Sequence, residues 1–443
     1  MHQGAKVIKL SRKLTLVVEE NSAALSAAVG IFVDCGSRSE PLHLQGVTHI
    51  AEHVFFKGTS QRSAEEISQT LERYGGDLNA YTDRELTVFH AWVPFDRCFE
   101  AADLLIELLL DSRFDADEFE KEKQVVVQEL KGYAEDPEEE FWDGLIESQF
   151  GQHPVGRRIG GFPEKVSQIS FPEVMRYIRE DFLASSWTLA VVSPFSAERV
   201  EREIRNILKK SGSYLWADSL RKSSPARKGS AKGNNFRIPK LPKDVSKSSK
   251  HVRFESEQVH VGFSYPAAAA TDPNEILWNA FIALAGVGSS SKLYSELRER
   301  RALAYNTSMS LLNFSDAGLA VGYLATDKSR MFEALSVAGQ VMRDFASRGI
   351  GDSELDFVHG MIEGSIYLGY QGVQGRMDTL GRQYQCFQRV FSLQDMLAEL
   401  RLLNKKALTK IAKNFSRTPS IYALGPLTKN DFTKLVKAWE TEL

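Results

Sequence analysis

The chain has 443 residues, too many for one ordinary hydrophobic core and suited to two domains of about 200 residues each. With 43% hydrophobic residues there is ample material for two cores, and a formal net charge of −3 indicates neither a nucleic-acid-binding protein nor an acidic tail. The three widely spaced cysteines, Cys35, Cys98 and Cys386, indicate reduced thiols rather than a disulfide framework.

The opening stretch, MHQGAKVIKLSRKLTLVVEE, shows no apolar core followed by small residues, which a secretory signal would have. The apolar stretch LLIELLL is far shorter than the roughly 20 residues that a membrane span needs, and Glu107 interrupts it. We therefore expect a soluble intracellular protein with no membrane partner.

Residue patterns in the first half predict an α+β unit. Strands are expected at 13–20, 27–36, 85–93 and 187–193, and helices at 48–57, 62–76, 97–110, 117–133 and after Pro172. The helix at 62–76 has clear boundaries, because Ser63 and Glu66 form a capping box and Gly75 with Gly76 ends the apolar stripe.

A change of composition separates the two halves of the chain. Residues 211–250 hold ten Lys or Arg against two Asp and are rich in Ser, Gly and Pro, which is typical of an exposed linker. Such a basic run is normally a solvated tether, and an anionic partner is the alternative. After it, strands are expected at 258–267, 306–312 and 318–326, and helices at 274–286, 291–303, 330–345 and from 353 onward. The repeated order predicts two related α+β domains, residues 1–210 and 251–443.

The stretch THIAEHVFFK, from Thr48 to Lys57, places His49, Glu52 and His53 in an otherwise apolar segment. On a helix, residues i, i+3 and i+4 share one face, so the two imidazoles project side by side, about 40° apart. Two such imidazoles can bind one Zn²⁺, and a neighbouring carboxylate that is not a ligand can act as a base toward water whose pKa the metal lowers. This is the inverted zincin pattern, H-x-x-E-H. Two buried histidines and an incidental glutamate remain the alternative, because so short a motif also arises by chance.

A catalytic zinc site needs three protein ligands and one open position. Glu129 lies 76 residues after His53, at the end of the apolar run VVVQEL, where a charge is costly unless a cation satisfies it. Glu122 lies seven residues earlier on the same helical face and could orient a ligand histidine or support Glu129. A solvated helix face explains Glu122 equally well.

These residues, with further segments, resemble the pitrilysin/insulinase family of inverted-motif zinc peptidases, in particular members similar to the β subunit of mitochondrial processing peptidase and its bacterial relatives. The matching segments follow the family's order over nearly the full length: HIAEH, GGDLNAYTDRELTVFH, VVVQELKGYAEDPEE, FGQHPVGRRIGG and SELRERRALAY. The resemblance implies two related α/β roll domains, with antiparallel sheets packed by helices, that together form half of a clamshell. It also implies the bacterial cytoplasm as the location, with the mitochondrial matrix as the alternative.

The resemblance assigns roles to the residues of the motif. It implies that His49, His53 and Glu129 hold one zinc ion per chain, that Glu52 is the general base and that Glu122 is the supporting acid. The counterpart of the zinc helix in the second half, NAFIALAGVGSSSKL, has no His or Glu, which agrees with a single metal. Another departure from the family, Ser193-Pro194 in place of a glycine, concerns only a loop.

The resemblance also points to substrate-binding residues. Asn79 and Ala80 match residues whose backbone holds the substrate as an added β-strand, although Asn79 could also be a turn residue before a strand. Arg298 and Tyr305 match a pair from the family's second type of domain, in which Arg holds a substrate carbonyl and Tyr donates to the developing oxyanion. Without the resemblance, Arg298 is explained as a solvated residue of the charged helix ELRERR.

The implied function is hydrolysis of unfolded peptides in a chamber closed by two halves. Because one chain supplies one half, we expect a homodimer in which Arg298 and Tyr305 of one chain complete the zinc site of the other. A heterodimer with an inactive homologue is the alternative. A non-catalytic scaffold is disfavoured by the complete motif. A hydrolase of non-peptide substrates is disfavoured by the matches at Asn79 and at Arg298 with Tyr305. The acidic run GYAEDPEEEFWDG favours basic substrate residues if it lines the chamber, but it can equally be a solvated acidic helix.

Overall fold

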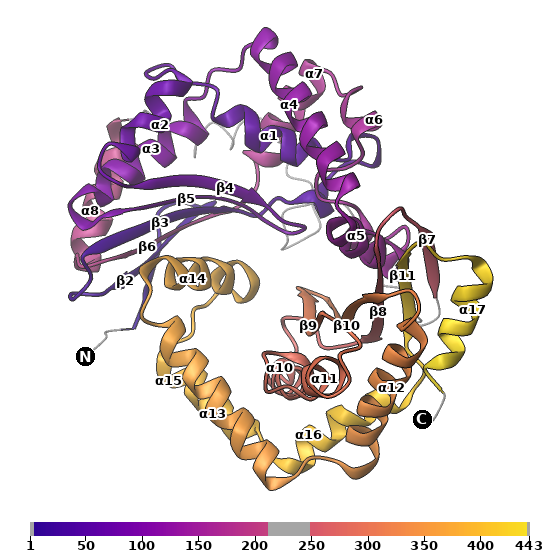
Figure 1. Ribbon diagram of the computed structural model, residues 1–443. Helices are drawn as coiled ribbons and strands as arrows, with labels where there is room; N and C mark the ends of the chain where they lie inside the picture. Colours follow the sequence, from indigo (N-terminus) through magenta and orange to yellow (C-terminus); the bar gives the residue numbers. More distant parts are fainter. Residues whose placement is uncertain (1–3, 211–248, 441–443) are drawn as a thin grey trace, which may run out of the picture. The chain divides into compact units, whose positions relative to one another are not determined.

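The computed structural model describes residues 4–210 and 249–440 (Figure 1). These residues form two compact units, each a β-sheet packed by helices, as the predicted α+β fold class requires. The first unit comprises residues 4–132, 157–210 and 367–393, and the second comprises residues 133–156, 249–366 and 394–440. Each unit is described by itself.

The sheet of the first unit contains six strands among the described residues. They are β1 (Lys6–Lys9), β2 (Leu14–Glu20), β3 (Ser26–Val33), β4 (Asp77–Thr82), β5 (Thr87–Pro94) and β6 (Trp187–Ser193). Their order in the sheet is β1-β2-β6-β3-β5-β4, so β4 lies at one edge. Neighbouring strands are antiparallel except for β2 and β6, which run parallel. This pair departs from the prediction of an antiparallel sheet.

Helices cover one face of this sheet (Figure 1). They are α1 (Val47–Phe55), α2 (Ala64–Glu72), α3 (Cys98–Leu110), α4 (Ala116–Glu135), α6 (Pro163–Val166), α7 (Phe171–Tyr177) and α8 (Ala197–Lys210). The predicted capping box at the start of α2 is confirmed: the Glu66 N–H donates to Ser63 Oγ, and the Ser63 N–H donates to Glu66 Oε2. The core between the helices and the sheet is apolar, and most residues of α3 are buried in it.

The sheet of the second unit repeats this topology. Its strands are β7 (Lys250–Arg253), β8 (Gln258–Pro266), β9 (Asn306–Phe314), β10 (Ala317–Asp327) and β11 (Ser420–Gly425). The order β7-β11-β8-β10-β9 matches β2-β6-β3-β5-β4, with β7 and β11 parallel and the other pairs antiparallel. The repeat predicted from the order of elements is therefore confirmed at the level of strand order and direction.

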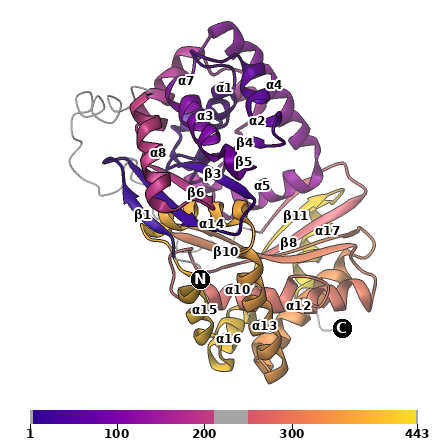
Figure 2. The same cartoon turned by 90° about the vertical axis from the view of Figure 1, so that its left-hand side faces the viewer.

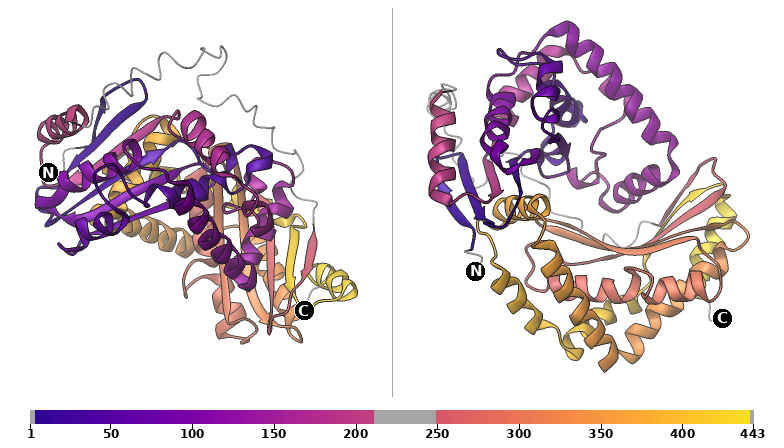
Figure 3. Two further views of the ribbon diagram at one scale, coloured as in Figure 1. Left: turned by 90° about the horizontal axis from the view of Figure 1, so that it is seen from above. Right: turned by 60° about the vertical axis from the view of Figure 1, so that its left-hand side comes forward.

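Helices α10 (Glu275–Gly286), α11 (Lys292–Tyr294) and α12 (Met331–Arg348) contact the strands of the second sheet, and further helices surround its core (Figure 3, right). Helix α11 continues as a π-helical turn over Ser295–Glu299. The further helices are α13 (Asp352–Gly369), α15 (Leu393–Glu399), α16 (Lys405–Ala412) and α17 (Lys429–Ala438). The helix predicted for 291–303 ends early, because Ala302 adopts a left-handed φ of 49°, which a helix cannot continue.

Each sheet is covered on its other face by a helix from the opposite half of the sequence. In the first unit this is α14 (Val373–Phe387), which packs on β3 and β6 (Figures 1 and 2). In the second unit it is α5 (Pro137–Phe150), which packs on β8 and β11. Each contact lies over a glycine: a Cβ at Gly30 of β3 would meet Met377 Sδ at 2.3 Å, and a Cβ at Gly262 of β8 would meet Leu145 Cδ1 at 2.5 Å.

The predicted division into residues 1–210 and 251–443 therefore needs a correction. The two units exchange α5 and α14, because each sheet has two apolar faces and both must be covered. Of the predicted linker 211–250, residues 211–248 lie outside the described residues, and Lys250 already belongs to β7.

In the described residues, none of the helices is both long enough and apolar enough to cross a bilayer.

Candidate metal centre

Helix α1 presents the HIAEH motif, and its first turn is held from the N-terminal side. Glu40 accepts hydrogen bonds from the backbone N–H groups of Gly46, at 2.8 Å, and Thr48, at 2.9 Å. Gly46 has a φ of 91°, a conformation that glycine adopts without strain. Burial raises the pKa of Glu40 to about 8, although the hydrogen bonds from Thr48 and Gly46 oppose this shift. The position of α1 thus depends on a buried carboxyl group.

Three side chains converge above α1. His49 Nε2 lies 3.3 Å from His53 Nε2, and Glu129 Oε2 lies 3.4 Å from His53 Nε2 and 3.9 Å from His49 Nε2. This is the one group of three potential metal ligands found within the described part of the chain. The three side chains are partly exposed, from 13% for His49 to 31% for Glu129, so the cluster is open on one side.

The geometry of this cluster fits a tetrahedral zinc ion. Ligand atoms bound at zinc distances of about 2.0–2.1 Å lie about 3.3–3.4 Å apart at the corners of a tetrahedron. Two of the three separations have this length, and the third, between His49 and Glu129, is longer at 3.9 Å. Burial, followed by the charge of His53, lowers the pKa of His49 to about 4, so at neutral pH this imidazole is in the uncharged form that binds metals.

Glu122 fixes the orientation of one histidine. His53 Nδ1 lies 2.9 Å from Glu122 Oε1, and Lys57 Nζ lies 2.5 Å from Glu122 Oε2. Burial opposes ionisation of Glu122, but the hydrogen bonds from His53 and Lys57 outweigh it and hold its pKa below the usual value. When the Glu122 carboxylate accepts a hydrogen bond from the N–H at His53 Nδ1, the lone pair is on Nε2. Nε2 then directs this lone pair at the cluster of His49, His53 and Glu129.

Both carboxylates come from α4. The buried side of this helix includes Phe119, Val126 and Leu130, which join the core of the first unit. Glu122 and Glu129 lie two turns apart on the helix, and each contacts a histidine of α1. The solvated helix face that sequence left open for Glu122 does not apply, since this residue is buried.

Glu52 lies on α1 between the two histidines and is not part of the ligand cluster. Thr82, the last residue of β4, donates a hydrogen bond of 2.5 Å from its Oγ1 to Glu52 Oε2. Burial raises the pKa of Glu52, and the hydrogen bond from Thr82 partly offsets this shift. Glu52 is thus a desolvated carboxylate that directly precedes His53 in the sequence and lies about one helical turn from His49.

A sequence profile described as insulinase (peptidase family M16) matches residues 15–161, and one described as the peptidase M16 inactive domain matches residues 168–358. An uncharacterized zinc protease of Mycobacterium leprae is 31% identical over 369 residues, which cover 83% of this chain and 80% of that protein. The chain belongs to peptidase family M16.

The chain is also similar to a second protein sequence and to a solved structure. The probable mitochondrial-processing peptidase subunit beta of Arabidopsis thaliana is 26% identical over 438 residues, covering 95% of this chain and 78% of that protein. The crystal structure of a protease from Helicobacter pylori superimposes with a TM-score of 0.80 at 18% identity, covering 96% of this chain and 99% of that one. At this identity the superposition shows the fold.

The remaining predicted site residues of this M16 chain lie in two places. Asn79 and Ala80 belong to edge strand β4, so the alternative of a turn residue at Asn79 is wrong. In the second unit, Arg298 Nη1 donates to Tyr305 O at 2.9 Å, and its guanidinium stacks 4.6 Å from the centre of the Tyr305 ring. Tyr305 is 73% exposed. The structure thus brings Arg298 and Tyr305 together on an accessible surface.

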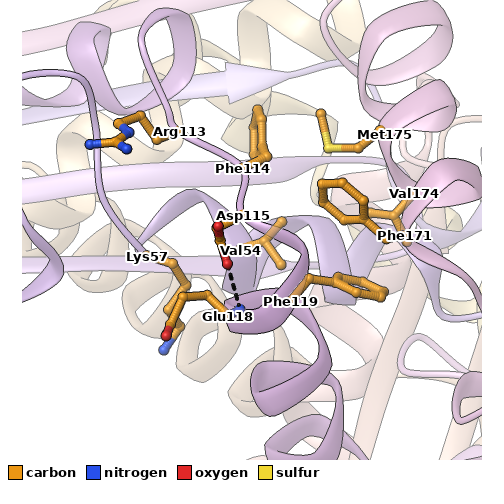
Figure 4. A pocket seen from close by; sticks show the side chains of 10 residues that line it. All are labelled: Val54, Lys57, Arg113, Phe114, Asp115, Glu118, Phe119, Phe171, Val174 and Met175. Atoms are coloured by element: carbon orange, nitrogen blue, oxygen red, sulfur yellow. Dashed lines mark hydrogen bonds between the residues drawn. The ribbon is translucent and has the colours of Figure 1, made fainter.

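A small cavity lies at the C-terminal end of α1 (Figure 4). Val54, Phe114 and Met175 are among its lining residues, and Lys57 stands at its border. Its volume of about 10 Å³ is enough for roughly one water molecule, so it cannot hold a substrate.

Sequence reasoning missed two residues of the site, Lys57 and Thr82. Thr82 lies inside GGDLNAYTDRELTVFH, one of the segments that match the family, and Lys57 ends the stretch THIAEHVFFK, so a spacing signal existed for each. Lys57 follows His53 by four residues, and Thr82 follows Ala80 by two, which puts it on the same side of the strand. What sequence could not show was that these side chains face Glu122 and Glu52.

Proposed function

We propose that this M16 protein is a zinc-dependent metalloendopeptidase that cleaves unfolded peptides inside a closed chamber, with one zinc ion per chain. The observation that carries the proposal is the convergence of His49 Nε2, His53 Nε2 and Glu129 Oε2, with separations of 3.3 to 3.9 Å. The names of relatives as zinc proteases support the choice of metal.

Zinc, when bound, would polarise the scissile carbonyl and lower the pKa of water toward about 7. Glu52 would then take the proton of the attacking water and pass it to the leaving amine. One of its oxygens, Oε2, accepts the hydrogen bond from Thr82, so Oε1 is the oxygen for proton transfer. Because burial raises the pKa of Glu52 toward the working pH, it is a suitable base and, once protonated, a suitable acid.

The edge position of β4 supports binding of the substrate as an added strand. On its inner side β4 pairs with β5, and Ala80 stands opposite Phe89 in that register. The Ala80 N–H donates to Asn79 Oδ1 at 2.8 Å, a contact that a substrate carbonyl would replace. Main-chain pairing of this kind gives affinity with little dependence on substrate sequence.

The experiment that tests the proposal is metal analysis and peptide turnover of the wild type beside Glu52→Gln. The variant keeps the shape of the side chain but cannot accept the proton. We expect one zinc per chain in both proteins and no turnover in the variant. Unchanged turnover would remove Glu52 from the mechanism, and a wild type without zinc would refute the proposal.

We further propose that the chain acts as a homodimer in which Arg298 and Tyr305 of one copy complete the zinc site of the other. The exposure of Tyr305, together with its contact with Arg298, supports a role toward an external group. Light scattering should show a dimer, and an active monomer would contradict this part of the proposal.

Mixing two inactive variants tests the shared site directly. One variant carries Glu52→Gln, and the other carries Arg298→Ala with Tyr305→Phe. In a mixed dimer, one of the two sites combines an intact Glu52 with an intact Arg298 and Tyr305, so activity should reappear on mixing. If the Arg and Tyr instead serve their own chain, mixing leaves activity absent.

The second candidate function is that of a subunit that depends on an inactive homologue. The Arabidopsis relative named as a processing-peptidase beta subunit favours this candidate. Turnover by the purified chain alone separates the two, because a dependent subunit is inactive until its partner is added.

The acidic run after Glu129 gives a proposal about substrate preference. Glu135, Glu138 and Glu139 are exposed, so their carboxylates are available to a substrate as well as to solvent. We propose a preference for basic residues near the cleaved bond. Cleavage of matched peptides with and without Arg decides this, and equal rates would favour the plain solvated helix.

A further inference from the structure

The residues on both sides of Thr82 are held by a helix from the other half of the sequence. Tyr81, at the preceding position of β4, donates a hydrogen bond from Oη to Asp378 of α14, and Arg382 Nη2 donates to the same Oη at 2.9 Å. Asp83, at the next position, accepts from Arg382 Nη1 at 2.9 Å. The end of β4 is thus bonded to α14 at two positions that flank Thr82.

The two faces of β4 explain this arrangement. Successive side chains of a strand point to opposite faces of the sheet. Tyr81 therefore faces α14, which covers one side of the sheet, and Thr82 faces α1 on the other side, where it reaches Glu52. Holding Tyr81 and Asp83 on one face sets the position of the Thr82 hydroxyl on the opposite face.

The pairing at α14 is itself fixed by neighbours on the helix. Arg382 Nε donates to Asp378 Oδ2 at 3.0 Å, so a single guanidinium joins Asp378, Tyr81 and Asp83. These side chains are partly exposed, with Arg382 at 42% and Asp83 at 30%, so each contact is weaker than a buried one. Together they form a network with defined geometry.

We propose that Thr82 is a positioning residue that orients the Glu52 carboxylate, and that Arg382 of α14 holds Thr82 in place through the flanking residues of β4. The inference rests on the proposed function, since it assigns a role relative to Glu52. Strand β4, proposed to pair with substrate through Asn79 and Ala80, would then carry the group that orients the base as well. Because α14 comes from the second half of the sequence, that half would help to set the orientation of the Glu52 carboxylate.

The first test replaces the hydroxyl of Thr82. Thr82→Val keeps the β-branched shape and removes the donor, whereas Thr82→Ser keeps the donor. We expect Thr82→Val to lower kcat about tenfold, with KM and zinc content unchanged, and Thr82→Ser to retain most of the activity. Thr70→Val is a matched control, because Thr70 Oγ1 donates only to a backbone carbonyl of its own helix, at 2.6 Å.

The second test addresses the link through α14. Arg382→Met should lower kcat several-fold without loss of zinc. If Arg382 acts through Thr82, the double variant Arg382→Met with Thr82→Val should be no slower than Thr82→Val alone. Arg389→Met is the control, since the Arg389 guanidinium stacks 4.2 Å from the ring of Phe391.

The outcomes are distinguishable. A wild type that turns over peptide, with Thr82→Val equally fast, overturns the inference and leaves the proposed function standing. Equal losses in Thr82→Val and Thr82→Ser, or a rise in KM alone, overturn the orienting role as well. Independent, additive losses in the double variant overturn the link through Arg382. A wild type without turnover overturns the inference together with the proposed function.

Discussion

Arg376 and Glu19 are 357 positions apart in the sequence and form a buried ion pair with several hydrogen bonds. Arg376 Nε and Nη2 donate to the Glu19 carboxylate at 2.8 to 3.0 Å, and the two side chains are 2% and 3% exposed. Arg376 belongs to α14 and Glu19 to β2, so the pair fixes the position of the exchanged helix on the sheet of the first unit.

Removing one member of this pair should be strongly destabilising. Arg376→Met leaves the Glu19 carboxylate buried without its partner, which we expect to cost about 3–5 kcal/mol. The shift of the thermal transition of the first unit measures the loss. The double variant Arg376→Met with Glu19→Leu is the control and should recover a large part of it, because no charge is then left unpaired. Equal melting of the wild type and Arg376→Met would contradict the interpretation.

Two glycines of α14 give a test of the close packing between this helix and the sheet. A Cβ at Gly381 would lie 2.1 Å from the ring of Phe32, whereas a Cβ at Gly375 has nothing within 4 Å. We expect Gly381→Ala to destabilise the first unit by about 1–3 kcal/mol through overpacking. Gly375→Ala should be neutral or stabilise it by up to about 1 kcal/mol, because alanine favours the helix. Thermal melts of both variants measure the change in stability. A change of the same sign in both variants would contradict the close contact at Gly381.

Substitution of single residues at the metal centre should distinguish a metal ligand from a residue that orients a ligand, by the loss of zinc affinity that each causes. Glu129→Gln should abolish tight zinc binding, because one of three ligands is lost. Glu122→Gln should weaken it by about 10- to 100-fold, as loss of an orienting partner does. Competition with a chromophoric chelator measures both affinities, and Glu118→Gln, on the exposed side of α4, serves as the control. Wild-type affinity in Glu129→Gln would exclude this residue as a ligand.

The buried Glu40 predicts a pH dependence of stability. Its pKa is raised from 4.5 to about 8 by burial, so between these values the folded protein keeps a proton that the unfolded chain has released. Stability that depends on Glu40 should therefore fall as the pH rises from about 5 to about 8. Glu40→Gln cannot ionise, and its melting temperature relative to the wild type should rise over this range. A difference that does not change with pH would show that Glu40 ionises at an ordinary pKa.

Local patterns were sufficient to predict much of this protein. The helix that carries His49 and His53, the capping box of α2 and the repeated order of strands and helices all follow from periodicities within about 20 residues. For the same reason, the placement of Glu122 and Glu129 on one helix was predictable. The end of the helix near Ala302 was not, because a left-handed residue there leaves no mark in the apolar pattern.

Only the tertiary structure decided the contacts between elements that are distant in the sequence. Thr82 reaches Glu52 across 30 positions and His53 meets Glu122 across 69, and no periodicity encodes such pairs. The exchange of α5 and α14 has the same origin: an amphipathic helix requires an apolar surface, but its own sequence does not specify which sheet will supply one. Sequence therefore determined the H-x-x-E-H pattern and the fold class, and packing determined which side chains contact Glu52 and His53.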